Sequence, residues 1–171
     1  MQAGTHGAFK RCVGSAIPFG IFDQHKNGVI MTVNTATARY EGLGKTGKGH
    51  VATRSGAIDA DYGFTTRFED APGTNPEEMI AAAHASCFTM ATSFALAGAG
   101  YEDGTLETEC KVTLKPDNGG FTVTKSELTL TGSVPGIDKA EFEKIAAEAK
   151  ANCPISKLLT CEITLTTQFN A

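Results

Sequence analysis

One segment constrains the fold of this chain more than any other, because it carries a full set of signals for a long helix. Asn75 can cap the helix, Pro76 suits its first position, and Glu78 lies three residues past the cap, as a capping box requires. Gly98 and Gly100 end it. Small and apolar residues occur on every side in between, so we expect a buried helix, packed inside a larger body or against a partner chain.

Strand patterns follow this helix. Apolar residues alternate with polar ones over 106–114, and an Asn-Gly-Gly turn at 118–120 leads into a second strand over 121–130, which predicts a hairpin. A capped amphipathic helix is expected over 138–151, with Asp138 as its cap. A last alternating strand spans 161–169.

The part before the long helix is predicted to be a small antiparallel meander. Alternation and β-branched residues favour strands over 33–40, 50–54 and 64–68, and a glycine-rich turn over 42–49 separates the first two. This turn lacks the glycine spacing of a phosphate-binding loop. The fold class is therefore α+β, with antiparallel strands before, between and after two main helices.

Length and charge limit the possible functions. A chain of 171 residues is expected to form one globular domain with a sufficient core of its own. The net charge is −4 and the basic residues are scattered, which argues against nucleic acid or an anionic membrane as a partner. No apolar run is long enough to span a bilayer, so we expect no membrane insertion.

The chain is divided into residues 1–30 and residues 31–171. The first segment makes a poor signal peptide, since Gly14, Pro18 and Gly20 interrupt its apolar stretch. Strand-like sequence begins at Met31, which we interpret as a second start of translation. Residues 1–30 are then an N-terminal extension with little structure, and a cytoplasmic location is expected.

The cysteines form neither a disulfide framework nor a zinc ribbon, because they are five in number and contain no Cys-x-x-Cys pair. A reducing compartment fits this usage. Two of them, Cys110 and Cys161, fall on inward strand positions and are expected to be core residues. No motif for a metal, flavin, haem or nucleotide is present. The five are Cys12, Cys87, Cys110, Cys153 and Cys161.

Cys87 and Cys153 occupy positions where a thiol can be reactive. Pro154 suits the first position of a short helix, which puts Cys153 at its cap, and the exposed N–H groups there should lower the pKa of its thiol. Cys87 lies within the long helix and gains no such help, so it needs a nearby cation. The candidate cations are Arg39, Arg54, Arg67 and the loop lysines Lys45 and Lys48.

His84 and Glu77 are the other candidates for a site around Cys87. His84 shares a helical face with Cys87 and could form a thiolate–imidazolium pair, although a buried histidine bonded to a carbonyl is the more ordinary outcome. Glu77 lies ten residues before Cys87 along the same helix, about 15 Å at 1.5 Å per residue, and cannot reach it directly. An arginine or a second subunit must connect Glu77 to the thiol, unless it only stabilises the helix start.

Two motifs with these cysteines resemble those of the OsmC/Ohr family of osmotically inducible and organic hydroperoxide resistance proteins, and most closely its OsmC branch. They are the segment 73–88, which holds Cys87, and Asn152-Cys153-Pro154-Ile155-Ser156. The similarity extends over 32–169 and includes the segments 62–69, 134–138 and 162–165.

The resemblance implies a thiol-dependent peroxidase for organic hydroperoxides, involved in the stress response. It also implies an intertwined homodimer with a long central helix, and recycling by an external thiol or dithiol. It makes Cys87 the peroxidatic thiol and Cys153 the resolving thiol, with Glu77 and an arginine, for which Arg67 is our choice, holding the thiolate ready. Two alternatives remain: a non-catalytic dimeric module with buried cysteines, and a metal site of Cys87, His84 and Cys153.

Overall fold

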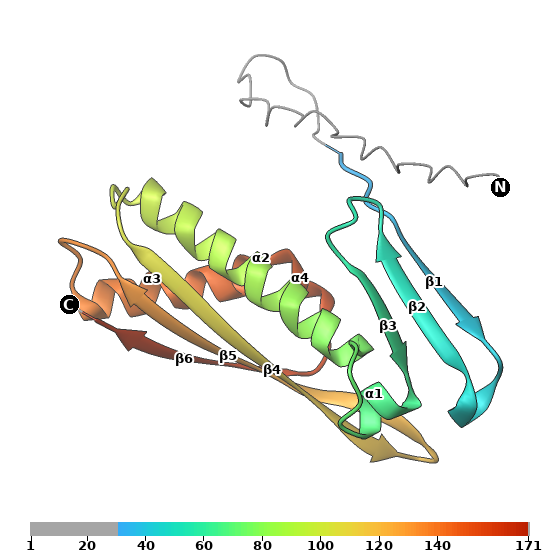
Figure 1. Cartoon of the computed structure of the whole chain (residues 1–171). Coiled ribbons are helices and arrows are strands. Elements are labelled where there is room, and N and C mark those ends of the chain that lie inside the picture. The colour runs from blue at the N-terminus through green and yellow to red at the C-terminus, as the bar shows by residue number, and fades with distance from the viewer. Residues whose placement is uncertain (1–30, 171) are drawn as a thin grey trace, which may run out of the picture. The chain divides into compact units, whose positions relative to one another are not determined.

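The computed structural model describes residues 31–170 (Figure 1). The described residues from Asn34 onward belong to one compact unit. The N-terminal extension that the sequence predicts, residues 1–30, lies outside the described residues, as does Ala171.

The first part of this unit is a three-stranded antiparallel sheet, which we call the N-terminal sheet. Its strands are β1 (Ala36–Glu41), β2 (Lys48–Thr53) and β3 (Asp59–Gly63), in that order. A short 3₁₀ turn, η1 (Gly44–Thr46), lies within the predicted glycine turn. The predicted meander is thus confirmed, although its third strand comes earlier than expected.

The segment predicted as a strand over 64–68 is instead a helix, α1 (Phe64–Phe68), and that prediction was wrong. The hydroxyl of Thr66 accepts a hydrogen bond from the Gly63 N–H at 2.8 Å, which caps the turn, and the rings of Phe64 and Phe68 stack at 5.0 Å. Spacing of the aromatic residues by four, together with this local cap, outweighed the β-branched threonines.

The long helix, α2 (Pro76–Gly98), begins and ends where the sequence predicts. The Asn75 side chain accepts a hydrogen bond from the Glu78 N–H at 2.8 Å. The Glu78 carboxylate does not complete a capping box; it accepts from the Thr74 hydroxyl at 2.8 Å. A single polar side chain thus caps the helix.

The sequence predicts that α2 is buried on every side. Within its own chain, however, the helix is buried on one side only. One stripe of it, spaced by four residues, is buried, whereas Met90 and Phe94 on another face are 58% and 72% exposed. By length and composition α2 could cross a membrane, and its buried stripe packs against neighbouring elements of the chain. The stripe consists of His84, Phe88, Thr92 and Leu96.

The second sheet, which we call the C-terminal sheet, is formed by β4 (Thr105–Asp117), β5 (Gly120–Ser133) and β6 (Glu162–Phe169). The first two form the predicted antiparallel hairpin, with Asn118 and Gly119 at positive φ in the turn. The third pairs parallel with β5, so the expectation of antiparallel strands throughout was wrong. The reason is the connection between β5 and β6. Its helices return the chain to the end of the sheet at which β5 begins, so that β6 runs in the same direction as β5.

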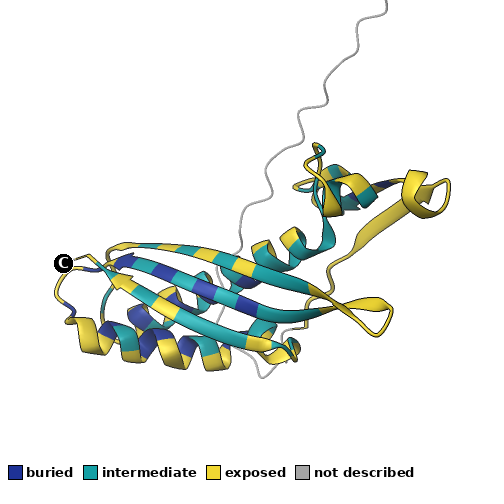
Figure 2. Ribbon diagram, turned by 90° about the horizontal axis from the view of Figure 1, so that it is seen from below, coloured by how far each residue is buried: buried dark blue, intermediate teal, exposed yellow. Residues whose placement is uncertain are grey.

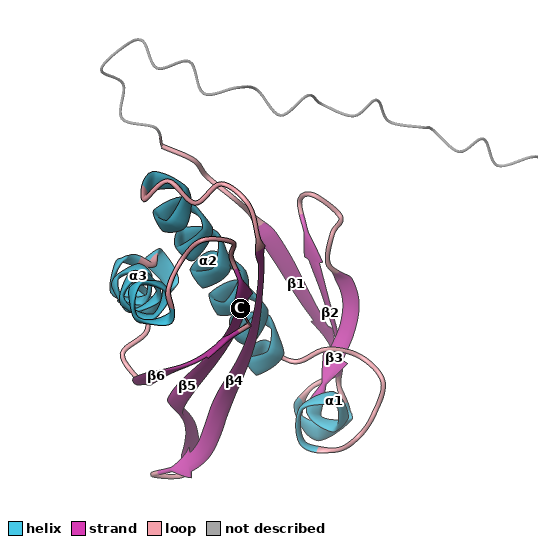
Figure 3. Cartoon of the chain, turned by 90° about the vertical axis from the view of Figure 1, so that its left-hand side faces the viewer, coloured by secondary structure: helices cyan, strands magenta, loops and turns pink. Residues whose placement is uncertain are grey.

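That connection contains α3 (Lys139–Asn152), capped by Asp138 as predicted, and α4 (Pro154–Leu158), which has Cys153 at its N-cap position without a capping hydrogen bond from the side chain. Helices α2 and α3 cover one face of the C-terminal sheet, with α2 against β4 and α3 against β6 (Figure 3). The core lies between these helices and the sheet, and buried residues follow β5 and the facing helix sides (Figure 2). It includes Phe88, Leu128, Leu130, Phe142, Ala146 and Cys153.

Candidate active site

Cys87 and Cys153, which are 66 positions apart in the sequence, meet in this structure. Their sulfur atoms lie 3.1 Å apart, at hydrogen-bonding distance. Cys153 is fully buried at the junction of α3 and α4, and Cys87 is half-buried in the middle of α2. A disulfide between them requires the sulfurs to approach by about 1 Å.

The surroundings of the two thiols differ in their effect on ionisation. Burial raises the pKa of Cys87, and the hydrogen bond with Cys153 raises it further, against one lowering contact from the Ile155 N–H. Burial also acts to raise the pKa of Cys153, but hydrogen bonds with the Ser156 N–H, the Cys87 thiol, the Ser156 hydroxyl and the Ile155 N–H outweigh it and lower that pKa. The lowered pKa expected for a thiol at this helix start is confirmed.

His84 is fully buried next to this thiol pair, and its partners were not foreseen. Its Nδ1 lies 2.8 Å from the Ser126 hydroxyl and its Nε2 lies 2.8 Å from the Ser156 hydroxyl. Neither the expected carbonyl nor the Cys87 thiol is its partner. Burial lowers the pKa of His84, which keeps the imidazole neutral near pH 7.

The sequence analysis did not identify Ser126 and Ser156, although the position of each serine in the sequence pattern indicated a buried polar contact. Ser126 is a polar residue in phase with the inward-facing Leu128 and Leu130 of β5, where a hydroxyl needs a buried partner. Ser156 follows the cap cysteine in the first turn of α4, so its side chain stays close to Cys153. What the sequence could not supply was the histidine that joins them.

Arg67 and Glu77 form a second cluster. The guanidinium of Arg67, in the last turn of α1, donates two hydrogen bonds to the Glu77 carboxylate, from Nε to Oε2 at 2.9 Å and from Nη2 to Oε1 at 2.6 Å. Its Cζ lies over the rings of Phe68 and Phe121, 5.2 and 6.0 Å from their centres. The bond to Glu77 raises the pKa of Arg67 against a smaller effect of burial. Such a fork fixes the direction in which the remaining N–H groups point.

The four residues that the resemblance selects thus fall into two pairs within this chain. Cys87 contacts Cys153, and Arg67 contacts Glu77, but the charged pair lies at the start of α2, ten residues before Cys87. A pocket of about 330 Å³ opens beside Arg67 and is lined mainly by the aromatic residues Tyr40, Tyr62, Phe64 and Phe68. The cation of Lys45 also borders it, 4.9 Å above the Phe64 ring.

The other sequence candidates lie elsewhere. Arg39 pairs with Glu41 on β1, and Arg54 is exposed beyond the end of β2. Cys110 is half-buried against the core, with its sulfur 3.3 Å from the Ser126 hydroxyl, and burial raises the pKa of its thiol. Cys161 is half-buried just before β6. Across residues 31–170 no three metal-ligating side chains converge, so the metal alternative lacks a ligand set there.

Comparison with known proteins defines the class first. Crystal structures of organic hydroperoxide resistance proteins share this fold: OhrB of Bacillus subtilis superposes with a TM-score of 0.60 at 26% identity, covering 81% of this chain and 98% of the other. A protein of the same class from Elizabethkingia anophelis gives 0.62 at 26% identity, covering 82% of this chain and all of the other. An OsmC-like protein of Mycoplasma pneumoniae, 13% identical, shares the fold with a TM-score of 0.66 over 83% of this chain and 100% of the other.

Sequence similarity then gives the family. Residues 68–168 match the OsmC-like protein family. The chain is 47% identical over 135 residues to peroxiredoxin OsmC of Escherichia coli, covering 78% of this chain and 94% of that protein. To OhrB of Bacillus subtilis it is 29% identical over 111 residues, 64% of this chain and 79% of that one. This chain belongs to the OsmC family and is more similar to OsmC than to the Ohr proteins, which confirms the predicted branch.

Proposed function

We propose that this protein is a thiol-dependent peroxidase that reduces organic hydroperoxides to alcohols through a disulfide between Cys87 and Cys153. The observation that carries the proposal is the 3.1 Å contact between the two sulfurs, in a chain 47% identical to a peroxiredoxin. A contact this short lets the second thiol reach an oxidised first thiol without refolding.

The chemistry runs in three steps. The Cys87 thiolate attacks the terminal peroxide oxygen, the O–O bond breaks, and the alkoxide takes a proton and leaves as an alcohol, so that Cys87 becomes a sulfenic acid. The Cys153 thiol then attacks the Cys87 sulfur, an S–S bond forms, the S–O bond breaks, and water leaves. An external thiol or dithiol reduces the disulfide by exchange and is itself oxidised.

Activation of Cys87 requires a cation, and within residues 31–170 no cation is among the groups that act on its thiol. Burial raises the pKa of the Cys87 thiol. The Arg67–Glu77 pair lies at the start of α2, ten residues before Cys87. We therefore propose that the protein acts as a homodimer in which the pair of one subunit faces Cys87 of the other. The exposed apolar side chains Met90 and Phe94 on α2 support such a dimer.

An organic hydroperoxide fits these surroundings better than hydrogen peroxide. Phe88 packs in the core next to Cys87, and the pocket beside Arg67 has aromatic walls. Apolar walls stabilise a hydrocarbon group by burial, which hydrogen peroxide cannot exploit. We expect higher kcat/KM for cumene hydroperoxide than for hydrogen peroxide.

A thiol count tests the proposal directly. Reduced protein should lose two thiols per chain on treatment with one equivalent of cumene hydroperoxide, and peptide mapping should find a bridge between Cys87 and Cys153. Cys87→Ser should abolish peroxide consumption, whereas Cys153→Ser should give a sulfenic acid that an alkylating probe traps. Cys161→Ser is the matched control and should behave as wild type.

Unchanged thiols would contradict the proposal. They would support the alternative of a non-catalytic dimeric module, in which the cysteine variants alter stability only.

A further inference from the structure

His84 is a buried titratable side chain that the two-thiol cycle leaves without a role. It is fully buried on α2, and both of its ring nitrogens are engaged at 2.8 Å by hydroxyl groups, Nδ1 by Ser126 and Nε2 by Ser156. A fully buried histidine with two short polar contacts is held in one orientation. That orientation decides what the ring can act on.

The Nε2 side leads to the thiol pair. Ser156 lies in the first turn of α4, three residues after Cys153, and its hydroxyl helps to lower the pKa of the Cys153 thiol. The same hydroxyl lies 2.8 Å from Nε2 of His84. The chain of contacts therefore runs from Cys153 through Ser156 to His84. Cys87, although only three residues from His84 along α2, joins this chain only through its 3.1 Å contact with Cys153.

The contacts at Nδ1 are compatible with the tautomer that carries its proton on Nδ1. The Ser126 hydroxyl lies 3.3 Å from the Cys110 sulfur, 2.8 Å from Nδ1, and can donate its proton to that sulfur. Its oxygen then accepts from Nδ1–H, which leaves Nε2 as the acceptor of the Ser156 hydroxyl proton. In this tautomer each hydroxyl proton has one acceptor, and the described residues hold no buried side-chain nitrogen or oxygen without a partner.

We propose that His84 is a positioning residue of the resolving step, which accepts a proton from Cys153 through the Ser156 hydroxyl while Cys153 attacks the oxidised Cys87. The inference rests on the proposed function, since it assigns a group to its second step. It goes further by adding His84, Ser156 and Ser126 to the residues that serve the reaction.

The proton transfer balances as follows. The Cys153 S–H proton moves to the Ser156 oxygen, and the Ser156 hydroxyl proton moves to Nε2 of His84. The thiolate sulfur forms the S–S bond as the S–O bond of the Cys87 sulfenic acid breaks. The departing hydroxide takes the proton of the Ser156 hydroxyl and leaves as water, and the Ser156 oxygen regains a proton from Nε2–H of His84, so that His84 ends neutral.

The surroundings of His84 suit a transient acceptor. Burial lowers the pKa of His84, so its Nε2 lone pair is available near pH 7. From the C-terminal sheet, the titratable side chain that approaches the ring is Cys110, with its sulfur 4.0 Å from Nδ1. Burial raises the pKa of the Cys110 thiol, so the thiol stays protonated. Among residues 31–170, no carboxylate hydrogen-bonds the ring to hold it permanently charged.

Rapid-quench mass spectrometry on the full-length chain separates the two steps. Reduced protein is mixed with one equivalent of cumene hydroperoxide, and samples are alkylated and analysed for oxidised Cys87 and for the disulfide. In His84→Gln and Ser156→Ala we expect Cys87 to be oxidised at the wild-type rate and the disulfide to form roughly 10²-fold more slowly. Sulfenic acid then accumulates, and excess peroxide converts it to sulfinic acid.

Thr92→Val is the matched control, because Thr92 is buried on the same stripe of α2 but its hydroxyl bonds only the Phe88 carbonyl. It should leave both steps unchanged. Glutamine retains one amide hydrogen bond to Ser156 but cannot take the proton, so wild-type disulfide formation in both His84→Gln and Ser156→Ala would overturn the proposal. Ser156 is half-buried, so its variant is a second test should the histidine variant not fold.

A titration keeps the two proposals separable. In a Cys87→Ser background, the ultraviolet absorbance of the Cys153 thiolate should appear at higher pH when His84 is also changed to Gln. A purely structural role of His84 would shift the melting temperature and leave this titration in place. If wild-type protein fails to oxidise Cys87, the proposed function fails, and this titration still decides whether His84 acts on Cys153.

Discussion

The two sheets of this protein are stabilised in different ways. The C-terminal sheet and its helices bury a continuous apolar cluster, in which Phe88, Leu128 and Phe142 are almost wholly inaccessible. In the N-terminal sheet, Val51 is the one buried apolar side chain recorded, and every residue of β1 is exposed (Figure 2). Burial of apolar surface is the main stabilising contribution to a fold. The C-terminal sheet with its helices therefore has a stabilising core of its own, and the N-terminal sheet does not.

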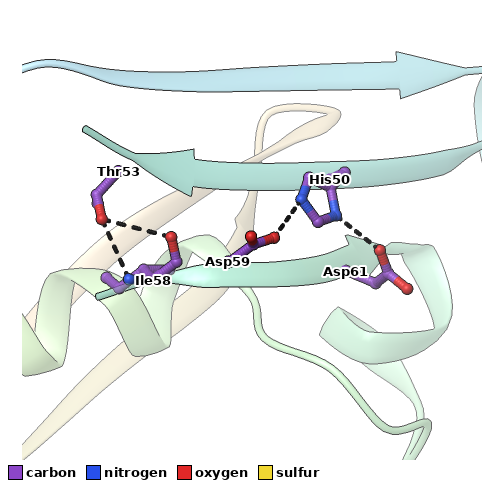
Figure 4. A network of polar contacts seen from close by, with 5 residues as sticks. All are labelled: His50, Thr53, Ile58, Asp59 and Asp61. Atoms are coloured by element: carbon purple, nitrogen blue, oxygen red, sulfur yellow. Dashed lines mark hydrogen bonds and ion pairs between the residues drawn. The ribbon is translucent and has the colours of Figure 1, made fainter. Parts of the chain in front are cut away.

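The N-terminal sheet uses exposed polar contacts instead. His50 on β2 lies between two carboxylates of β3, with Nε2 2.7 Å from Asp59 and Nδ1 2.9 Å from Asp61 (Figure 4). Exposed ion pairs contribute little to stability. The two thiols therefore lie in the region with the large apolar core, whereas Arg67, which is proposed to serve them, lies on α1, directly after the last strand of the N-terminal sheet.

Loss of core packing should give the largest effect. Phe142 packs on Gly132, where a Cβ atom would overlap its ring, and its own ring lies 5.2 Å from that of Phe169. Phe142→Ala should lower the free energy of unfolding by about 3–5 kcal/mol, and Val51→Ala by about 1–2 kcal/mol. Urea unfolding measures both. Equal losses would mean that the N-terminal sheet has a core comparable to that of the C-terminal sheet.

Removal of the Arg67 charge should give the second-largest effect. It tests whether Arg67, on α1, serves Cys87, on α2. Arg67→Met should slow oxidation of Cys87 roughly 10²-fold, the loss typical of one charge-stabilising group, whereas Arg54→Met should have no effect. Stopped-flow consumption of cumene hydroperoxide measures the rates.

Mixing variants tests where the arginine comes from. If Arg67 serves the partner subunit, dimers of Arg67→Met with Cys87→Ser chains should regain activity, because one site then holds both groups. Activity that is not regained would place the arginine and the thiol in the same subunit.

The smallest effect, on the pH dependence of stability, should differ in sign between the two regions. Burial lowers the pKa of His84 below 6.5, so its contribution to stability is present above that pH and is lost as the pH falls. The bond to Asp61 raises the pKa of His50 against slight burial, with Asp59 adding to it, so its contribution is present below 6.5 and is lost as the pH rises through the raised value.

Unfolding free energies between pH 5 and 8, about the range over which imidazole titrates, check this. His84→Gln should remove a slope of at most about 1.4 kcal/mol per pH unit on the acid side. His50→Gln should remove a weaker slope of the opposite sign. Slopes of the same sign in both variants would contradict the assignment of the two environments.

Much of the fold could be predicted from local signals. The caps at Asn75 and Asp138, the Asn118–Gly119 turn and the cap position of Cys153 act within a few residues, and the structure has each where it was expected. The parallel pairing of β6 was missed because strand direction depends on the path of the connecting helices. The helix over 64–68 was missed because the β-branched threonines favour a strand, and the hydrogen bond by which Thr66 caps the helix is not evident from the sequence.

The sequence by itself determined which residues form α2, that a thiol at Cys153 has a lowered pKa, and the family to which both motifs belong. Hydrogen bonds within one turn and side-chain spacing decide these, and both are readable along the chain. Only the tertiary structure decided that Cys87 and Cys153 touch, that Arg67 binds Glu77, and that His84 joins Ser126 to Ser156. These contacts link residues up to 72 positions apart, and packing of α2 and α4 against the C-terminal sheet sets them rather than any local preference.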